Sequence, residues 1–358
     1  MKTPAYIDVL SAYEPGKPIS VLQRETGVAD IVKLASNENP LGPSPKAMAA
    51  MQRALPALHR YPDDGFALKQ ALAAHYGVPP DEIVLGSGSD SLMLAIVRAF
   101  VSEGGEVVTS QWSFAQYYLM PQSRGAVVRA APMHDYRYDL AAVAALVTDR
   151  TQLIFLANPN NPTGTMYTRA EWAAFYARIP PQIPIVCDEA YAEFVQGDPE
   201  WPDSLRERHD NVITLRTFSK AYGLAGLRLG FAIATPAVAH TLHKVKLPFE
   251  PSGLALVAGT AALEDQAFVR EYVTLVREER AWVTAQLQRL GIAVVPSVAN
   301  FVLVHFPTVA DAARIHGALE ARGIIVRPLA AAGLPQALRI TIGRPDENRR
   351  LMAALEVS

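Results

Sequence analysis

The chain has 358 residues, of which 50% are hydrophobic and 19% are charged, and its formal net charge is −2 at neutral pH. This composition is typical of a globular protein with about two domains and a large buried core, and it excludes a disordered chain. No block of lysine and arginine is present, so we expect no nucleic-acid partner. The single cysteine, Cys187, excludes an intramolecular disulfide framework and favours a reducing compartment.

The N-terminal segment lacks the apolar centre of a signal peptide, and no part of the chain approaches the apolar run of a membrane span. We therefore expect no membrane partner and a cytoplasmic location. Residues 1–40 are rich in proline, glycine and asparagine, which predicts an extended arm with little regular structure that contributes to the smaller domain.

The predicted elements that follow begin with a helix from Pro45 to about Leu55 and a turn at 61–65. Short apolar runs then alternate with helical stretches. The predicted strands are 82–85, 106–110, 126–130, 152–157, 183–187, 212–216 and 229–234. Most of these runs are continuous rather than alternating, a pattern typical of strands covered on both faces. The chain is therefore predicted to be an α/β protein, with a large domain over 41–245 built on a mainly parallel seven-stranded sheet flanked by helices.

The pattern changes after about residue 240. The predicted elements there are a long helical segment at 263–290, which could be broken, then residues 293–306, a helix at 310–322, strands at 324–327 and 338–343, and a terminal helix. These elements predict a smaller C-terminal α/β domain over 246–358.

The segment 217–230, TFSKAYGLAGLRLG, combines two hydroxyls, a lysine and an arginine in a glycine-rich stretch. A solvated lysine after a strand is the ordinary interpretation of Lys220. Its apolar and small neighbours instead predict a desolvated amine with a lowered pKa, which can form a Schiff base with a carbonyl compound. Thr217, Ser219 and Arg228 are hydrogen-bond donors that suit a phosphate.

Asp188 follows the predicted strand 183–187, at the edge where open α/β sheets bind ligands. It could be a helix N-cap, or it could pair with a pyridine nitrogen and keep that nitrogen protonated. The turn 158–164, NPNNPTG, follows another strand and could present an asparagine amide to a ligand. The segment 86–90, GSGSD, precedes a helix, whose free N–H groups would bind phosphate.

In this combination the chain resembles, over its full length, the fold-type-I aminotransferases that depend on pyridoxal 5′-phosphate (PLP). Within them it is most similar to the histidinol-phosphate aminotransferase subfamily. The resemblance is carried by residues 34–45 (LASNENPLGPSP), 60–63 (RYPD), the NPNNPTG turn, the SKAYGLAGLRLG segment and 338–348 (LRITIGRPDEN).

The resemblance implies that Lys220 forms the Schiff base with PLP and later moves the substrate proton, while Asp188 pairs with the ring nitrogen. It also implies the remaining cofactor contacts. Asn161 and Tyr191 would bind the ring's phenolic oxygen, Phe114 (or alternatively Trp112) would stack on the ring, and Gly88, Ser89, Asp90, Thr217, Ser219 and Arg228 would hold the phosphate. Tyr61 would reach the phosphate of a neighbouring subunit, which implies a homodimer with shared active sites; otherwise it is a turn tyrosine packed on the core.

For the substrate, the resemblance implies that Arg339 clamps the carboxylate of glutamate or the phosphate of histidinol phosphate, with Arg327 and Tyr13 near the same phosphate. A structural salt bridge is the alternative for Arg327. The implied reaction is ping-pong transfer of an amino group between histidinol phosphate and 2-oxoglutarate in histidine biosynthesis. An aromatic-amino-acid aminotransferase, a decarboxylase of a phosphorylated amino acid, and a binding module on the same fold remain as alternatives.

Overall fold

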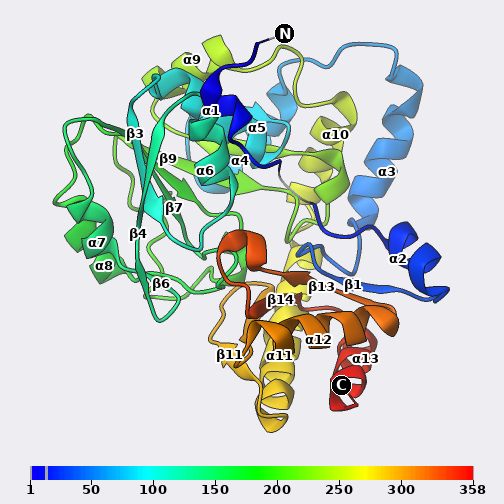
Figure 1. The fold of residues 1–358 in the computed structure, drawn as a ribbon. Helices are drawn as coiled ribbons and strands as arrows, with labels where there is room; N and C mark the ends of the chain where they lie inside the picture. Colours follow the sequence, from blue (N-terminus) through cyan, green and yellow to red (C-terminus); the bar gives the residue numbers. More distant parts are fainter. Residues whose placement is uncertain (1, 13–14, 358) are drawn as a thin grey trace.

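The computed structural model describes residues 2–12 and 15–357, which form two main β-sheets with helices packed around them (Figure 1). The larger sheet has seven strands in the order β2-β10-β9-β8-β7-β3-β4. Its strands are β2 (Ile83–Gly86), β3 (Glu106–Ser110), β4 (Val127–Ala131), β7 (Thr151–Ala157), β8 (Ile185–Asp188), β9 (Val212–Thr217) and β10 (Gly230–Ile233). Only β10 runs antiparallel to its neighbours in this sheet. The predicted fold class is therefore confirmed, and each predicted strand of the larger sheet overlaps an observed one.

Helices cover both faces of the larger sheet, which explains why its strands are continuous apolar runs. Successive strand residues point to opposite faces, so Val107 and Val108 enter different core clusters. One face is covered by α5 (Gly88–Phe100), α6 (Gln116–Gln122) and α9 (Pro236–Val245). The other is covered by α4 (Phe66–Tyr76), α7 (Leu140–Ala145), α8 (Arg169–Tyr176) and α10 (Gly253–Leu263), and α3 (Pro45–Ala54) packs on α10.

The smaller sheet has five strands in the order β1-β13-β14-β12-β11. They are β1 (Val32–Leu34), β11 (Ala293–Val295), β12 (Phe301–His305), β13 (Ile324–Pro328) and β14 (Ala337–Thr341), packed with α12 (Val309–Ala321) and α13 (Pro345–Glu356). The long helix α11 (Gln266–Arg289) joins the two halves: its first part packs in the core of the larger sheet, and Val283 and Leu287 pack in that of the smaller. Because α10 also packs with the larger sheet, the domain division at 245 and 246 stays a proposal.

The N-terminal arm has more regular structure than its composition predicted. It contains α1 (Ala5–Asp8), α2 (Ile19–Thr26) and strand β1, which Figure 1 shows beside β13. The pairing is parallel, with Val32 opposite Ile324, and Leu22 of α2 packs against Ile325. The partners of these elements lie about three hundred residues away in the sequence, so a local pattern could not predict them.

Three smaller corrections concern element boundaries. The helical segment predicted at 263–290 is α11, which begins at Gln266 after α10 ends at Leu263. Residues 293–306, for which the sequence predicts no element type, contain two strands, β11 and β12, paired antiparallel. A two-stranded hairpin, β5 (Met133–His134) and β6 (Arg137–Tyr138), was not predicted. Within residues 2–12 and 15–357, no helix is long and apolar enough to cross a membrane, and no cluster of three or more metal-ligating side chains occurs.

Candidate active site

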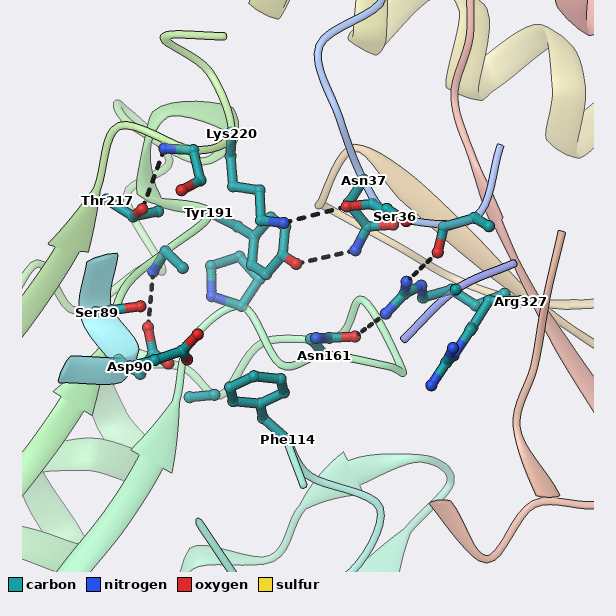
Figure 2. Close-up of a pocket in the computed structure, with 18 of the residues that line it drawn as sticks. Ser36, Asn37, Ser89, Asp90, Phe114, Asn161, Tyr191, Thr217, Lys220 and Arg327 are labelled. Atoms are coloured by element: carbon teal, nitrogen blue, oxygen red, sulfur yellow. Dashed lines mark hydrogen bonds between the residues drawn. The ribbon is translucent and has the colours of Figure 1, made fainter. Parts of the chain in front are cut away.

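A cavity of about 210 Å³ lies between the two sheets, at the carboxyl ends of β7, β8 and β9. The larger sheet contributes Asp188 and the segment that follows β9, while the arm contributes residues 35–37. Arg327 and Arg339 come from β13 and β14 of the smaller sheet. Figure 2 shows Lys220, Asn37 and Arg327 reaching the same space from these different segments. The site therefore exists only where the arm and both sheets meet.

Lys220 lies three residues beyond the end of β9 and extends into the cavity (Figure 2). Its Nζ donates a hydrogen bond to the backbone oxygen of Ser36 at 3.3 Å and lies 5.7 Å from the centre of the Tyr191 ring. Burial, with the nearby positive charge of Arg339 as the next contribution, lowers the pKa of the Lys220 amine to about 8. Lys220 is therefore a nucleophile with a larger neutral fraction near pH 7 than an ordinary lysine has.

Asp188 is the last residue of β8, and it is held between Ala157 of β7 and Leu215 of β9. Its carboxylate accepts the hydroxyl of Tyr117 at 2.6 Å and the backbone N–H of Ala190 at 3.1 Å. Burial raises the pKa of the Asp188 carboxyl to about 6. The bond to Ala190 closes a turn two residues on and does not cap an α-helix, so the N-cap alternative is wrong. A buried carboxylate in this position suits a cationic or N–H partner in the cavity.

A group of anion-binding donors lies where α5 begins. Ser89 and Asp90 stand in the first turn of α5, whose N–H groups have no partners within the helix. Arg228 reaches this turn: its guanidinium donates to Asp90 at 3.2 Å and to Ser219 at 3.4 Å. Gly88 does not line the cavity, but a Cβ there would lie 2.6 Å from a nitrogen of Arg228, and its φ is +81°. Glycine at this position therefore makes room for the Arg228 guanidinium. We call this group, formed by Ser89, Thr217, Ser219 and Arg228 at the start of α5, the cradle.

Two arginines face the opposite end of the cavity. Arg327 and Arg339 are register partners on the antiparallel strands β13 and β14. The Arg339 guanidinium donates to the backbone oxygen of Ala35 at 2.6 Å and to the side-chain oxygen of Asn161. Two guanidinium groups on paired strands favour an anionic substrate group such as a carboxylate or a phosphate.

The amino-acid sequence matches, over residues 29–355, the family model described as aminotransferase class I and II. The chain belongs to this family. A histidinol-phosphate aminotransferase of Anaeromyxobacter sp. (strain Fw109-5) is 47% identical over 98% of this chain and 97% of that protein. Histidinol-phosphate aminotransferase 2 of Ralstonia nicotianae is 47% identical over 99% of this chain and 96% of that protein.

The fold agrees with a solved structure of the same kind of aminotransferase. The histidinol-phosphate aminotransferase of Sinorhizobium meliloti, in complex with pyridoxal-5′-phosphate, superposes with a TM-score of 0.90 and is 34% identical. The match covers 99% of this chain and 96% of that one.

Most of the site residues predicted for this aminotransferase come together in the cavity. Those that line it are Ser89, Asp90, Phe114, Asn161, Asp188, Tyr191, Thr217, Ser219, Lys220, Arg228, Arg327 and Arg339. Trp112 instead lines a neighbouring cavity of about 720 Å³, which also reaches Phe114, so the placement favours Phe114 for stacking on a ring. Tyr13 lies outside the described residues.

Tyr61, like Gly88, is a predicted site residue that does not line the cavity. It is 79% exposed and stacks on the Phe249 ring, with the two centroids 4.3 Å apart. It is therefore not packed on the core, and the turn-tyrosine alternative is wrong in that respect.

Several cavity residues were missed in the sequence, above all Tyr117, Asn37 and Ser36. Asn37 donates to the hydroxyl of Tyr191 at 2.9 Å, and the Ser36 backbone accepts from Lys220. The two arm residues lie in the segment 34–45 that carries the family resemblance, but no local pattern gives them a role, because they reach the cavity through the pairing of β1 with β13. Tyr117 has a weak signal, since it follows Phe114 by three residues, a spacing that brings two side chains together in a helical turn, although α6 begins only at Gln116.

Proposed function

We propose that the chain is a histidinol-phosphate aminotransferase that uses PLP and transfers an amino group between histidinol phosphate and 2-oxoglutarate in histidine biosynthesis. The observation that supports this substrate is the pair Arg327 and Arg339, which lies on paired strands at the end of the cavity away from the start of α5. A phosphate carries up to two negative charges, and two guanidinium groups match it better than they match an apolar side chain. The names of the relatives support the same assignment.

The residues present fit PLP. The cradle of Ser89, Thr217, Ser219 and Arg228 at the start of α5 suits its phosphate, and Gly88 leaves room there for the Arg228 guanidinium. When bound, PLP supplies an aldehyde carbon for the amine and a ring that withdraws electrons from the substrate. Asp188 would hold the proton on the ring nitrogen, Phe114 would cover the ring, and Asn161 with Tyr191 would orient its phenolic oxygen.

Lys220 has two tasks in this proposal. Its amine is the attachment point for the cofactor aldehyde, and once displaced by substrate it moves the proton from the substrate Cα. Both tasks need the neutral amine. The lowered pKa of Lys220, to about 8, makes that form available near neutral pH.

The rate at which the cofactor-free protein reacts with PLP should therefore rise with pH, with a midpoint at about 8, because half of the Lys220 amine is neutral at its pKa, and it should level off at higher pH. The measurement is stopped-flow absorbance across a pH series. A Lys220→Arg variant serves as the control, because any reaction that it still shows comes from the other lysines. A midpoint at the ordinary lysine value of 10.5 would contradict the role given to burial.

The substrate is tested by single half-reactions. The PLP-loaded protein is mixed separately with histidinol phosphate, phenylalanine and tyrosine, and the conversion of the cofactor to its amine form is followed by absorbance. The expected result is the highest kcat/KM for histidinol phosphate. Faster conversion with phenylalanine or tyrosine would favour the aromatic-amino-acid alternative. CO₂ release from a phosphorylated amino acid, in the absence of a keto acid, would favour the decarboxylase.

We also propose a homodimer with shared active sites. Tyr61 and Phe249 stack on each other, both are exposed, and Leu55, Leu58 and Leu247, close to them in the sequence, are also exposed apolar side chains. Exposed apolar side chains that gather into a patch mark protein interfaces. In such a dimer Tyr61 of one subunit would reach the cofactor phosphate in the other.

Hybrid dimers test the sharing directly. A dimer of one Lys220→Ala chain and one Tyr61→Ala chain would contain one intact site, and about half of the wild-type activity is expected because symmetric dimers carry two equivalent sites. The matched control places both substitutions on one chain and pairs it with a wild-type chain, which leaves no intact shared site. If the control hybrid is the active one, each site is built within one subunit.

A cytoplasmic location is part of the same proposal. The chain's one cysteine, Cys187, is buried and free, and burial raises the pKa of its thiol well above the usual value. Such a thiol is inert and needs no disulfide partner, as in a reducing compartment.

A further inference from the structure

We infer that Tyr117 is a positioning residue of the aminotransferase, whose hydroxyl holds the Asp188 carboxylate in its charged form and in the orientation that faces the cofactor ring nitrogen. This inference rests on the proposed use of PLP. It concerns a residue that does not take part in the chemistry given above. Tyr117 would act through Asp188.

The geometry places Tyr117 between Asp188 and the residue proposed to cover the ring. Its hydroxyl donates to Oδ2 of Asp188 at 2.6 Å, and its side chain is fully buried. The Tyr117 ring lies parallel to Phe155, with centroids 5.0 Å apart and planes 5° apart. It meets Phe114 at 84°, with centroids 5.8 Å apart. Stacking on Phe155 therefore holds the ring, and with it the hydroxyl.

Both oxygens of Asp188 are thereby constrained. Oδ2 accepts from Tyr117, and Oδ1 accepts from the N–H of Ala190. A carboxylate that accepts one donor on each oxygen cannot rotate freely about its last bond. Each oxygen retains a lone pair, so a ring N–H in the cavity can still be bound.

The charge on Asp188 depends on the same contact. Burial raises the pKa of this carboxyl, while the hydrogen bonds from Tyr117 and Ala190 oppose the rise. The charges of Asp90 and Lys220 also act on it, the first raising and the second lowering its pKa. Burial and the Asp188 charge raise the pKa of Tyr117 itself well above its usual value, so its hydroxyl keeps its proton at working pH.

Tyr117→Phe tests this contact because it removes one hydroxyl and keeps the ring on Phe155 and Phe114. The expected result is a kcat about tenfold lower in both half-reactions, with KM changed by less than about twofold, since a hydrogen bond to a charged group is lost while substrate contacts remain. Unchanged kcat would overturn the inference.

A spectroscopic readout separates positioning from a merely structural effect. Without the hydroxyl, Asp188 binds its own proton more readily and holds the ring nitrogen's proton less well. The protonated nitrogen that joins Lys220 to the cofactor then loses a repelling positive charge. The pH midpoint of the bound cofactor's visible absorbance is therefore expected to rise by up to about one unit. An unmoved midpoint with reduced kcat would leave only a structural role and would also overturn the inference.

The matched control is Tyr118→Phe. The neighbouring tyrosine also donates a hydrogen bond of 2.6 Å, but to the backbone oxygen of Ser110 rather than to Asp188. The pH midpoint of the cofactor absorbance in the Tyr118→Phe variant should equal that of the wild type. In an Asp188→Asn background, Tyr117→Phe should move the midpoint no further, because the two residues act as one unit. An equal shift with and without Asp188 would contradict action through this residue.

The failure of this inference can be told apart from the failure of the proposed function. The absorbance titration is made without any amine, so it does not depend on which donor the enzyme uses. A wild-type protein that binds no PLP would end the proposed function. A wild-type protein that binds PLP, with a Tyr117→Phe variant that titrates identically, would end only the role of Tyr117.

Discussion

Replacing Lys220 by alanine is expected to lower the rate of amino-group transfer by at least about 10³-fold, because one substitution removes both the cofactor attachment point and the proton carrier. The variant should also lose the visible absorbance of the Lys220-linked cofactor. The measurement is a half-reaction at saturating amine, together with a spectrum of the PLP-loaded protein.

The control for this experiment is Lys244→Ala, which removes an exposed lysine in the last turn of α9. Its activity should equal that of the wild type. Turnover of the Lys220→Ala protein at the wild-type rate would refute the role of this lysine, and with it the proposed mechanism.

Arg216→Met is expected to lower the free energy of unfolding by about 3–5 kcal/mol, the usual effect of removing one partner of a buried ion pair. Arg216 is buried in β9, and its guanidinium lies 2.6 Å from Glu189 and 3.1 Å from Asp203. It also lies 5.5 Å from the ring centres of both Tyr76 and Trp201. Methionine would fill part of the space and leave the Glu189 carboxylate buried without its cation.

The comparison for this variant is Arg137→Met, which breaks the exposed ion pair with Glu171 and should cost less than about 1 kcal/mol. Urea unfolding at one fixed protein concentration measures both variants. Equal losses would show that burial does not govern the contribution of Arg216. Because Glu189 follows Asp188 and Arg216 precedes Thr217, a large loss would also show that this ion pair joins the strand ends beside the cavity.

The seven strands of the larger sheet could be predicted because burial on both faces leaves a local trace. The run at 106–110 matches β3 at both ends, since each of its side chains is buried whichever face it meets. The apolar and small neighbours of Lys220 predicted a desolvated amine, and the amine is buried. The groups beside its Nζ, the Ser36 backbone oxygen and the Tyr191 ring, nevertheless come from distant segments of the sequence.

Contacts between distant segments leave no comparable pattern in the local sequence. The arm was predicted to be irregular because the partner of β1 is β13, far along the chain. Arg327 and Arg339 lie side by side only because β13 and β14 pair in the register that places them opposite each other.

The sequence by itself thus determined the α/β class, the strands of the larger sheet, and the residue types that hold a phosphate, a pyridine nitrogen and a Schiff-base carbonyl. Tertiary structure alone decided that Phe114 rather than Trp112 lines the cavity, that Tyr61 faces away from it, and that Tyr117 bonds Asp188. The physical reason is the range of the interactions. Strand burial acts on consecutive residues, whereas hydrogen bonds between side chains 71 positions apart depend on how the elements pack.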